Sequence, residues 1–213
     1  MAKQRICWLV SGGLLGLYLG GCWLSTFYIN WVEKFNEKGA PLFIRLGSSS
    51  FQSLWSGLNH IGDFSFSLLI SCVMGIVLAF FKRGITGLFL VLGVIVSRLI
   101  HDLFWNLFAE PDVPIFHGQV SIGVWPSEEM MITVVFYGFL MGLLVYFLWI
   151  NKNWMVVIWA SIGLLVFYIL QGFALLLLGE DSILQILSGA ILGWIQLGVW
   201  FGLLGWLGRG KWR

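Results

Sequence analysis

The most regular feature of the sequence is a series of long apolar segments separated by shorter polar ones. An α-helix rises about 1.5 Å per residue, so roughly 20 apolar residues span the hydrocarbon core of a bilayer. The segments that approach this length lie at about residues 6–31, 65–81, 85–108, 130–150, 154–178 and 185–207. The pattern therefore predicts an all-α fold, a six-helix transmembrane bundle.

The polar connections between these segments differ in length. Those at residues 82–84 and 151–153 are short and suit antiparallel helices that are neighbours in space. The connections at about 32–64 and 109–129 are longer and fall at the opposite end of the predicted bundle. We expect residues 1–213 to form a single transmembrane domain, since a chain of this length builds one compact unit.

Composition supports the membrane assignment. Hydrophobic residues make up 59% of the chain and charged residues 10%, whereas soluble domains carry about 25% charged residues. A soluble fold is therefore excluded, and the lipid bilayer is the first partner. The basic residues flank turns and are not interleaved with aromatic ones, so nucleic-acid binding is not expected.

The charges predict the orientation of the bundle. Eight of the twelve Lys and Arg residues fall at one end, and these are Lys3, Arg5, Lys82, Arg83, Lys152, Arg209, Lys211 and Arg213. The ten acidic residues all fall at the other end or on helix ends that face it. Because basic loops stay in the cytoplasm, both termini are predicted to be cytoplasmic and the acidic end to face outward.

The first apolar segment has two interpretations. A basic start followed by an apolar stretch and the run Leu19–Cys22 is similar to a lipoprotein signal, which would be cleaved to remove residues 1–21. The residues after Cys22 continue apolar, which favours an uncleaved first helix instead.

The third segment carries ionisable residues at membrane depth, namely Arg98, His101 and Asp102. Such residues are costly in a bilayer and often functional. Arg98 and Asp102 stand four apart on one helical face and can pair. The pair therefore either neutralises itself inside the bundle, or Asp102 and His101 form part of a site.

Further acidic residues gather at the same predicted outer end. They are Asp112 after the third segment, Glu128 and Glu129 at the start of the fourth, and Glu180 and Asp181 before the sixth. Ser127 followed by carboxylates is also a helix-start pattern, in which the hydroxyl caps the helix and the acids favour its first turn. A capping role and a functional role both remain open for these residues.

Three stretches at this end, at residues 108–114, 126–129 and 179–193, stand in the order and at the helix positions of three known motifs. From about residue 50 to 207 the chain resembles the membrane branch of the type 2 phosphatidic acid phosphatase (PAP2) superfamily. The resemblance implies six helices and an outward-facing site that removes phosphate from lipid phosphates and isoprenoid diphosphates. It also implies a prokaryotic cytoplasmic membrane as the location.

The residues at the motif positions depart from the family chemistry. In the first motif the lysine falls on Trp105 and the arginine on Asp112; in the second the histidine falls on Glu129. In the third, the arginine, the nucleophilic histidine and the orienting aspartate fall on Leu175, Asp181 and Gln185. Phosphoryl transfer of this kind needs cations and a histidine nucleophile. We therefore expect the inherited reaction to be lost.

Two hypotheses remain for the function. The first is a protein that binds a lipid or isoprenoid, or an accessory subunit of a membrane complex. The second is a divergent hydrolase of lipid phosphates or isoprenoid diphosphates, with Asp112, Glu129 and Asp181 as catalytic carboxylates. Its substrate pocket would be lined by Asp102, His101, Glu128, Ser127 and Trp105.

A divalent metal could serve that second hypothesis, because carboxylates are hard oxygen ligands. Its predicted ligands are Asp112, Glu128, Glu129 and Asp181. Other classes fit less well. A glutamate-type intramembrane protease would need an arginine after Glu128-Glu129 and histidines downstream, and no histidine follows His117. A transporter would be expected to show broken helices or paired repeats, which the sequence does not reveal.

Overall fold

In the computed structural model, the described residues are 52–108, 126–150, 154–178 and 180–207, and every regular element among them is a helix. The helices are α3 (Gln52–Gly62), α4 (Phe64–Phe80), α5 (Gly84–Phe108), α6 (Glu128–Ile150), α7 (Trp154–Leu178) and α8 (Ile183–Leu207). The predicted first span at 6–31 and the predicted site residue Asp112 lie outside the described residues.

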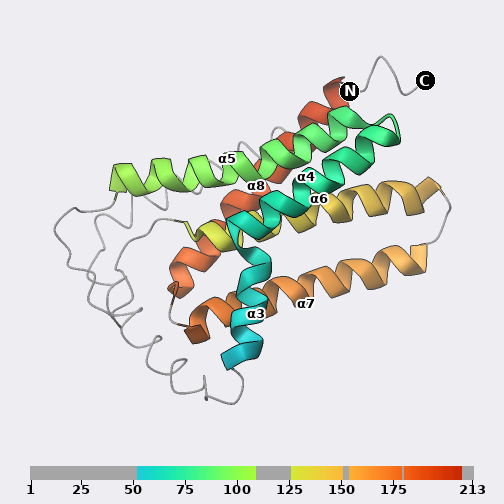
Figure 1. Cartoon of the computed structure of the whole chain (residues 1–213). Coiled ribbons are helices and arrows are strands. Elements are labelled where there is room, and N and C mark those ends of the chain that lie inside the picture. Colours follow the sequence, from blue (N-terminus) through green and yellow to red (C-terminus); the bar gives the residue numbers. More distant parts are fainter. Residues whose placement is uncertain (1–51, 109–125, 151–153, 179, 208–213) are drawn as a thin grey trace.

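Helices α4 to α8 coincide with the last five predicted apolar segments, with bounds that differ by a few residues (Figure 1). Four of these helices are long and apolar enough to cross a membrane, with spans at Gly84–Asn106, Glu128–Val145, Trp154–Leu178 and Ile183–Leu207. Helix α4 passes the same test together with α3, to which it is joined at a bend of 53°. The all-α membrane fold predicted from the sequence is therefore confirmed.

Helix α3 was not predicted, because residues 32–64 were assigned to a connection. It is short and more polar than the spans, and it crosses the bundle steeply near α7 (Figure 1). The break after it has a local cause. Asp63 adopts φ −58° and ψ 141°, and its carboxylate accepts a hydrogen bond from the Ser65 N–H at 3.3 Å, which starts a new helix.

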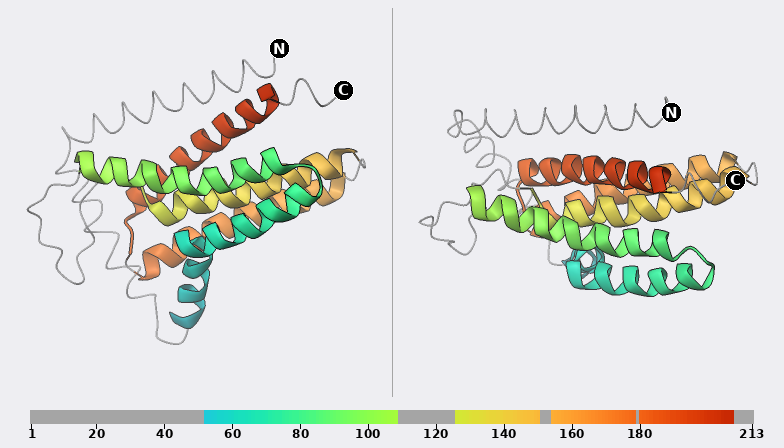
Figure 2. Two further views of the ribbon diagram at one scale, coloured as in Figure 1. Left: turned by 45° about the horizontal axis from the view of Figure 1, so that its top comes forward. Right: turned by 90° about the horizontal axis from the view of Figure 1, so that it is seen from above.

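The α4–α5 turn has the tight form predicted from its sequence. Lys82 adopts φ 59°, which is uncommon for a residue with a side chain. The Lys82 N–H donates to the Ala79 carbonyl at 2.9 Å and the Arg83 N–H to the Leu78 carbonyl at 2.8 Å, so carbonyls at the end of α4 are satisfied. The turn brings α4 and α5 together as antiparallel neighbours (Figures 1 and 2).

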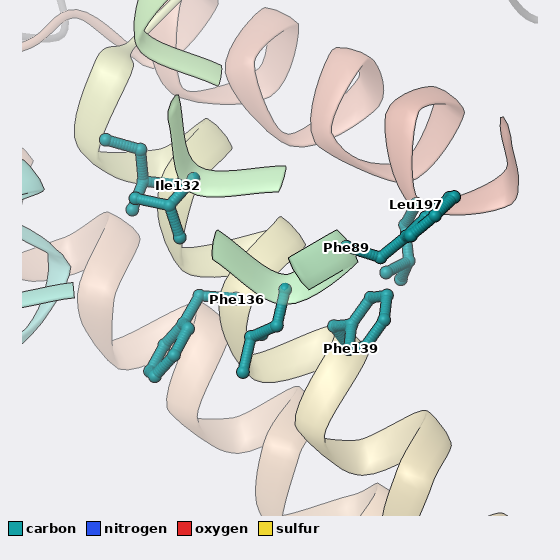
Figure 3. Close-up of a cluster of buried hydrophobic side chains, with 7 residues drawn as sticks. Phe89, Ile132, Phe136, Phe139 and Leu197 are labelled. Carbon is teal, nitrogen blue, oxygen red and sulfur yellow. The ribbon is translucent and has the colours of Figure 1, made fainter. Parts of the chain in front are cut away.

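Helix α6 is the centre of the bundle, since it packs against α5, α7 and α8 as well as α3 and α4. Figure 3 shows the largest buried cluster, in which Phe136 and Phe139 of α6 meet Phe89 of α5 and Leu197 of α8. By contrast, α7 leaves large apolar side chains such as Trp159 exposed along its length. That pattern suits a helix whose outer face contacts lipid.

Candidate functional site

The candidate site lies at one end of the bundle. There the C-terminal half of α5, the first turn of α6 and the α7–α8 turn come together, at the left of Figure 1. The α4–α5 turn, with Lys82 and Arg83, lies at the opposite end. The separation of charges along the sequence is therefore also a separation in space among the described residues.

Ser127 fixes the start of α6 against α8. Its hydroxyl accepts a hydrogen bond from the Met130 N–H at 3.1 Å, the cap predicted from the sequence, and its own N–H donates to the Gln185 carbonyl at 2.9 Å. A Cβ added to Gly189 would lie 2.5 Å from the Ser127 carbonyl oxygen, so only glycine allows this close approach. Residues 126–129 are thus held against residues 179–193, the stretches of the second and third motifs.

Arg98 joins α5 to α6 through two carboxylates. Its Nε lies 3.3 Å from Asp102 Oδ1, which confirms the predicted pair on one helical face. Its Nη1 also donates to Oε2 of Glu128, a partner 30 residues away that the sequence did not predict. Glu128 is buried, so this second contact compensates a carboxylate that is largely removed from water.

His101 lies one turn outward of Arg98 and is held by the chain before α6. Its Nδ1 is 2.9 Å from the Pro126 carbonyl oxygen, which can only accept a hydrogen bond. Nδ1 therefore carries a proton, and in the neutral ring Nε2 carries the lone pair. The ring stacks on Trp105, with centroids 6.2 Å apart and planes inclined at 29°. These two predicted pocket residues are thus brought together.

Asp181 lies in the turn between α7 and α8 and faces the start of α6. Burial raises the pKa of its carboxyl from 3.8 to about 6, and the negative charges of Glu180 and Glu128 act in the same direction. A hydrogen bond with the Ser127 side chain and the nearby His101 oppose that rise. Its Oδ2 is buried without a hydrogen-bond partner.

Glu129 is brought close to Asp181, with which it interacts electrostatically. These two predicted site residues are therefore within range of electrostatic interaction, and their catalytic role stays a prediction. Glu128 at the neighbouring position pairs with Arg98 instead. The predicted metal site gains no support from this arrangement. Within residues 52–108, 126–150, 154–178 and 180–207, no group of three or more His, Cys, Asp or Glu side chains could hold a metal ion.

Gln185 stands at the position that the resemblance assigns to an orienting aspartate, and here it caps a helix. The Ser182 N–H donates to Gln185 Oε1 at 2.7 Å, and the Gln185 N–H donates to the Ser182 hydroxyl at 3.3 Å. This reciprocal pair is a capping box. A Ser-x-x-Gln pattern before an apolar run could have revealed it in the sequence.

Residues of α3 also reach this end of the bundle, and sequence reasoning missed them. The Asn59 side-chain Nδ2 donates to Glu180 Oε2 at 2.5 Å, and the Tyr137 hydroxyl of α6 donates to the Ile61 carbonyl at 3.2 Å. No local signal could have predicted either contact, because each joins segments far apart in the chain.

No family model matches the sequence, and no curated protein is similar enough to match it. The structure nevertheless identifies the class: the chain is an integral membrane protein with the transmembrane PAP2-type fold. Its fold is similar to the crystal structure of the first transmembrane PAP2 type phosphatidylglycerolphosphate phosphatase from Bacillus subtilis, with a TM-score of 0.70. The match covers 100% of both chains at 23% sequence identity, so the predicted resemblance is confirmed for the fold.

Proposed function

We propose that this chain binds a lipid or isoprenoid at the outer end of a PAP2-like bundle, alone or as a subunit of a membrane complex, without hydrolysing a phosphate. The main support for this proposal is that the charge of Arg98 is already paired. Among the residues that the structure describes, Arg98 is the only lysine or arginine at this end of the bundle. Both Asp102 and Glu128 already neutralise its charge. A phosphate would have to displace these carboxylates to reach it.

Electrostatics around the site also disfavour a phosphate. Glu129 and Asp181 occupy positions at which the resembled family has histidines, and the two carboxylates interact electrostatically. A negative charge 4 Å from each would be repelled by about 1 kcal/mol per pair in water, and by about 4 kcal/mol at the dielectric near a protein surface. These costs oppose the binding step on which phosphoryl transfer depends.

We further propose that this end faces outward and that the opposite end is cytoplasmic, with both termini on the cytoplasmic side of a prokaryotic membrane. The support comes from the two ends of the described bundle. Lys82 and Arg83 lie at one end, whereas Glu128 and Asp181 lie at the other. Basic turns remain in the cytoplasm during insertion.

Phosphate release provides the test of the binding role. Purified chain in lipid nanodiscs is incubated with phosphatidylglycerolphosphate and, separately, with undecaprenyl diphosphate, and free phosphate is measured. We expect no release above that of empty nanodiscs. Release that is abolished in Asp181→Asn and retained in the control Thr86→Val, at the opposite end of α5, would refute the proposal.

A second candidate function, a divergent hydrolase, is favoured by one observation. His101 has its Nδ1 fixed on the Pro126 carbonyl and lies near Asp181, which is an arrangement suited to acid–base chemistry. In this alternative His101 Nε2 takes a proton from the water that attacks phosphorus and returns it to the leaving lipid oxygen, while the Asp181 carboxylate stabilises the charged ring. Loss of phosphate release in His101→Ala, with unchanged stability, would establish it.

A further inference from the structure

Unpartnered polar atoms gather at one junction in the bundle. Among the residues that the structure describes, six buried side-chain atoms have no hydrogen-bond partner: Asn59 Oδ1, Thr133 Oγ1, Gln171 Nε2, Gln171 Oε1, Asp181 Oδ2 and Trp200 Nε1. All but Trp200 Nε1 belong to α3, α6, α7 and the α7–α8 turn. Buried polar atoms are nearly always paired in native proteins, so this concentration indicates a further partner at the junction, either water or a ligand.

Thr133 and Gln171 define the inner part of the junction. Both side chains are completely buried, although neither makes a hydrogen bond. Both point at Gly62 of α3, because a Cβ added there would lie 2.5 Å from Gln171 Nε2 and 2.7 Å from Thr133 Oγ1. Gly62 of α3 and the polar side chains of Thr133 on α6 and Gln171 on α7 therefore meet at one point.

The outer part of the junction is acidic. Glu129 stands one helical turn outward of Thr133 on the same face of α6. It interacts with Asp181, and Asn59, one turn before Gly62 on α3, contacts Glu180. Arg98 does not neutralise these carboxylates, because it forms ion pairs with Glu128 and Asp102 on the α5 side.

The chemistry of these atoms selects the ligand. Asp181 Oδ2, Asn59 Oδ1 and Gln171 Oε1 are acceptors, and the Thr133 hydroxyl can accept as well, so the junction needs hydrogen-bond donors. A positive charge would also stabilise Glu129 and Asp181, two interacting carboxylates at a largely buried site. Water supplies no charge, and no group of three or more His, Cys, Asp or Glu side chains among the described residues could hold a metal ion. Gln171 can turn its Oε1 toward the ligand, because neither of its amide atoms has a partner. A primary ammonium group supplies both three donors and the charge.

We infer that the junction between α3, α6, α7 and the α7–α8 turn holds the primary ammonium group of a ligand. This inference rests on the proposed binding role and names its headgroup chemistry. The ammonium could belong to an ethanolamine lipid headgroup, which the surrounding bilayer would deliver, or to a free amine. Both sources present the same donors and the same charge, so the experiment separates them.

The test measures binding to the whole chain in nanodiscs. Phosphatidylethanolamine is titrated into phosphatidylcholine nanodiscs with the same acyl chains, and the midpoint of thermal unfolding is followed. The choline headgroup keeps the charge and the phosphate but has no N–H donor. We expect phosphatidylethanolamine to stabilise the chain in a saturable way. Soluble ethanolamine, added to pure phosphatidylcholine nanodiscs, tests the free-amine source.

Isosteric variants link the response to the junction. Thr133→Val removes a hydroxyl that has no partner in the structure, so it is expected to fold, and Gln171→Leu provides a second variant. Each should weaken the apparent affinity about tenfold, the effect of losing one hydrogen bond to a charged group. Thr86→Val, on the distant end of α5, should bind like the unchanged chain.

The outcomes separate this inference from the proposed function. An unfolding midpoint that stays the same as phosphatidylethanolamine replaces phosphatidylcholine would overturn the inference. So would an apparent affinity for phosphatidylethanolamine that Thr133→Val leaves unchanged. So would the pattern of a junction that holds only water, in which no amine stabilises the chain and Thr133→Val raises its stability in every bilayer. Either failure leaves the absence of phosphate hydrolysis untouched, because that is measured by phosphate release.

Discussion

At the scale of single residues, Arg98 organises the outer end of the bundle because two carboxylates of different burial share it. Asp102 is roughly half exposed, with a side-chain exposure of 46%, whereas Glu128 retains 11%. An exposed ion pair contributes little, while a buried carboxylate depends strongly on its partner. The same guanidinium therefore makes one weak and one strong contact.

This difference predicts unequal effects of two charge-removing substitutions. Glu128→Gln should lower the free energy of unfolding by about 1.5–3 kcal/mol, since it weakens a charged hydrogen bond at a buried site. Asp102→Asn should lower it by less than about 1 kcal/mol. Denaturant titration of both variants in one detergent measures the difference. Equal losses would show that Glu128 does not depend on Arg98.

Asp181 predicts a pH dependence of stability. Its folded pKa is raised from 3.8 to about 6, so between these values the folded chain binds more protons than the unfolded chain. The contribution of Asp181 to stability should therefore be greatest below about pH 4 and fall as the pH rises through about 6, by an amount on the order of 3 kcal/mol. The charged groups around it are Glu128, Glu129, Glu180 and His101.

Unfolding of the unchanged chain and of Asp181→Asn across this pH range isolates the contribution. The asparagine retains an oxygen for the Ser127 hydroxyl but does not titrate. The difference in stability between the two chains should follow the fall described above. A difference that stays constant from pH 4 to pH 7 would contradict the raised pKa of Asp181.

Residue-level contacts could be predicted from the sequence only where they are local. The Arg98–Asp102 pair follows from a spacing of four on a helix, and the Ser127 cap follows from its place before an apolar run. The contact of Arg98 with Glu128 joins two helices, and its register depends on how they pack. Nothing in either segment alone encodes that register.

At the scale of elements, the break between α3 and α4 directs α3 across α6 and α7. Gly62 sits where these helices meet, and the missing Cβ allows the close approach. The sequence did not reveal α3, because a helix of 11 residues with mixed polarity lacks the long apolar run that marks a span. Its existence depends on packing against α7 and α6 rather than on its own pattern.

Two glycines of α3 provide a matched pair for testing this packing. Gly62→Ala places a Cβ against Gln171 and Thr133 and should destabilise the chain by about 1–3 kcal/mol. Gly57→Ala has nothing within 4 Å and should be neutral or slightly stabilising, because alanine favours a helix. Thermal unfolding of both variants checks this. A harmless Gly62→Ala would mean that α3 does not pack as described.

At the scale of the whole molecule, hydrophobic length determined which segments form the spanning helices. The five predicted spans within the described residues all correspond to helices, since twenty or so apolar residues in lipid must satisfy their backbone internally. The arrangement of these helices around α6 was available only through the resemblance. The arrangement depends on shape complementarity among many side chains, and the periodicity of the sequence does not encode this complementarity.

The proposed orientation predicts which residues are accessible from outside the cell. In a cysteine-free background, Glu180→Cys should react with a membrane-impermeant maleimide on intact cells. Lys82→Cys, at the basic α4–α5 turn, should react only after the membrane is permeabilised. The opposite labelling pattern would reverse the topology and place the acidic end in the cytoplasm.

We propose that this PAP2-type fold binds a ligand without hydrolysing a phosphate, and a single-turnover measurement can test this. Purified chain in molar excess is incubated with phosphatidylglycerolphosphate, and the lipid is followed by mass spectrometry over time. We predict that the lipid keeps its terminal phosphate throughout. Conversion to phosphatidylglycerol that Asp181→Asn or His101→Ala abolishes would contradict the claim and establish the chain as an enzyme.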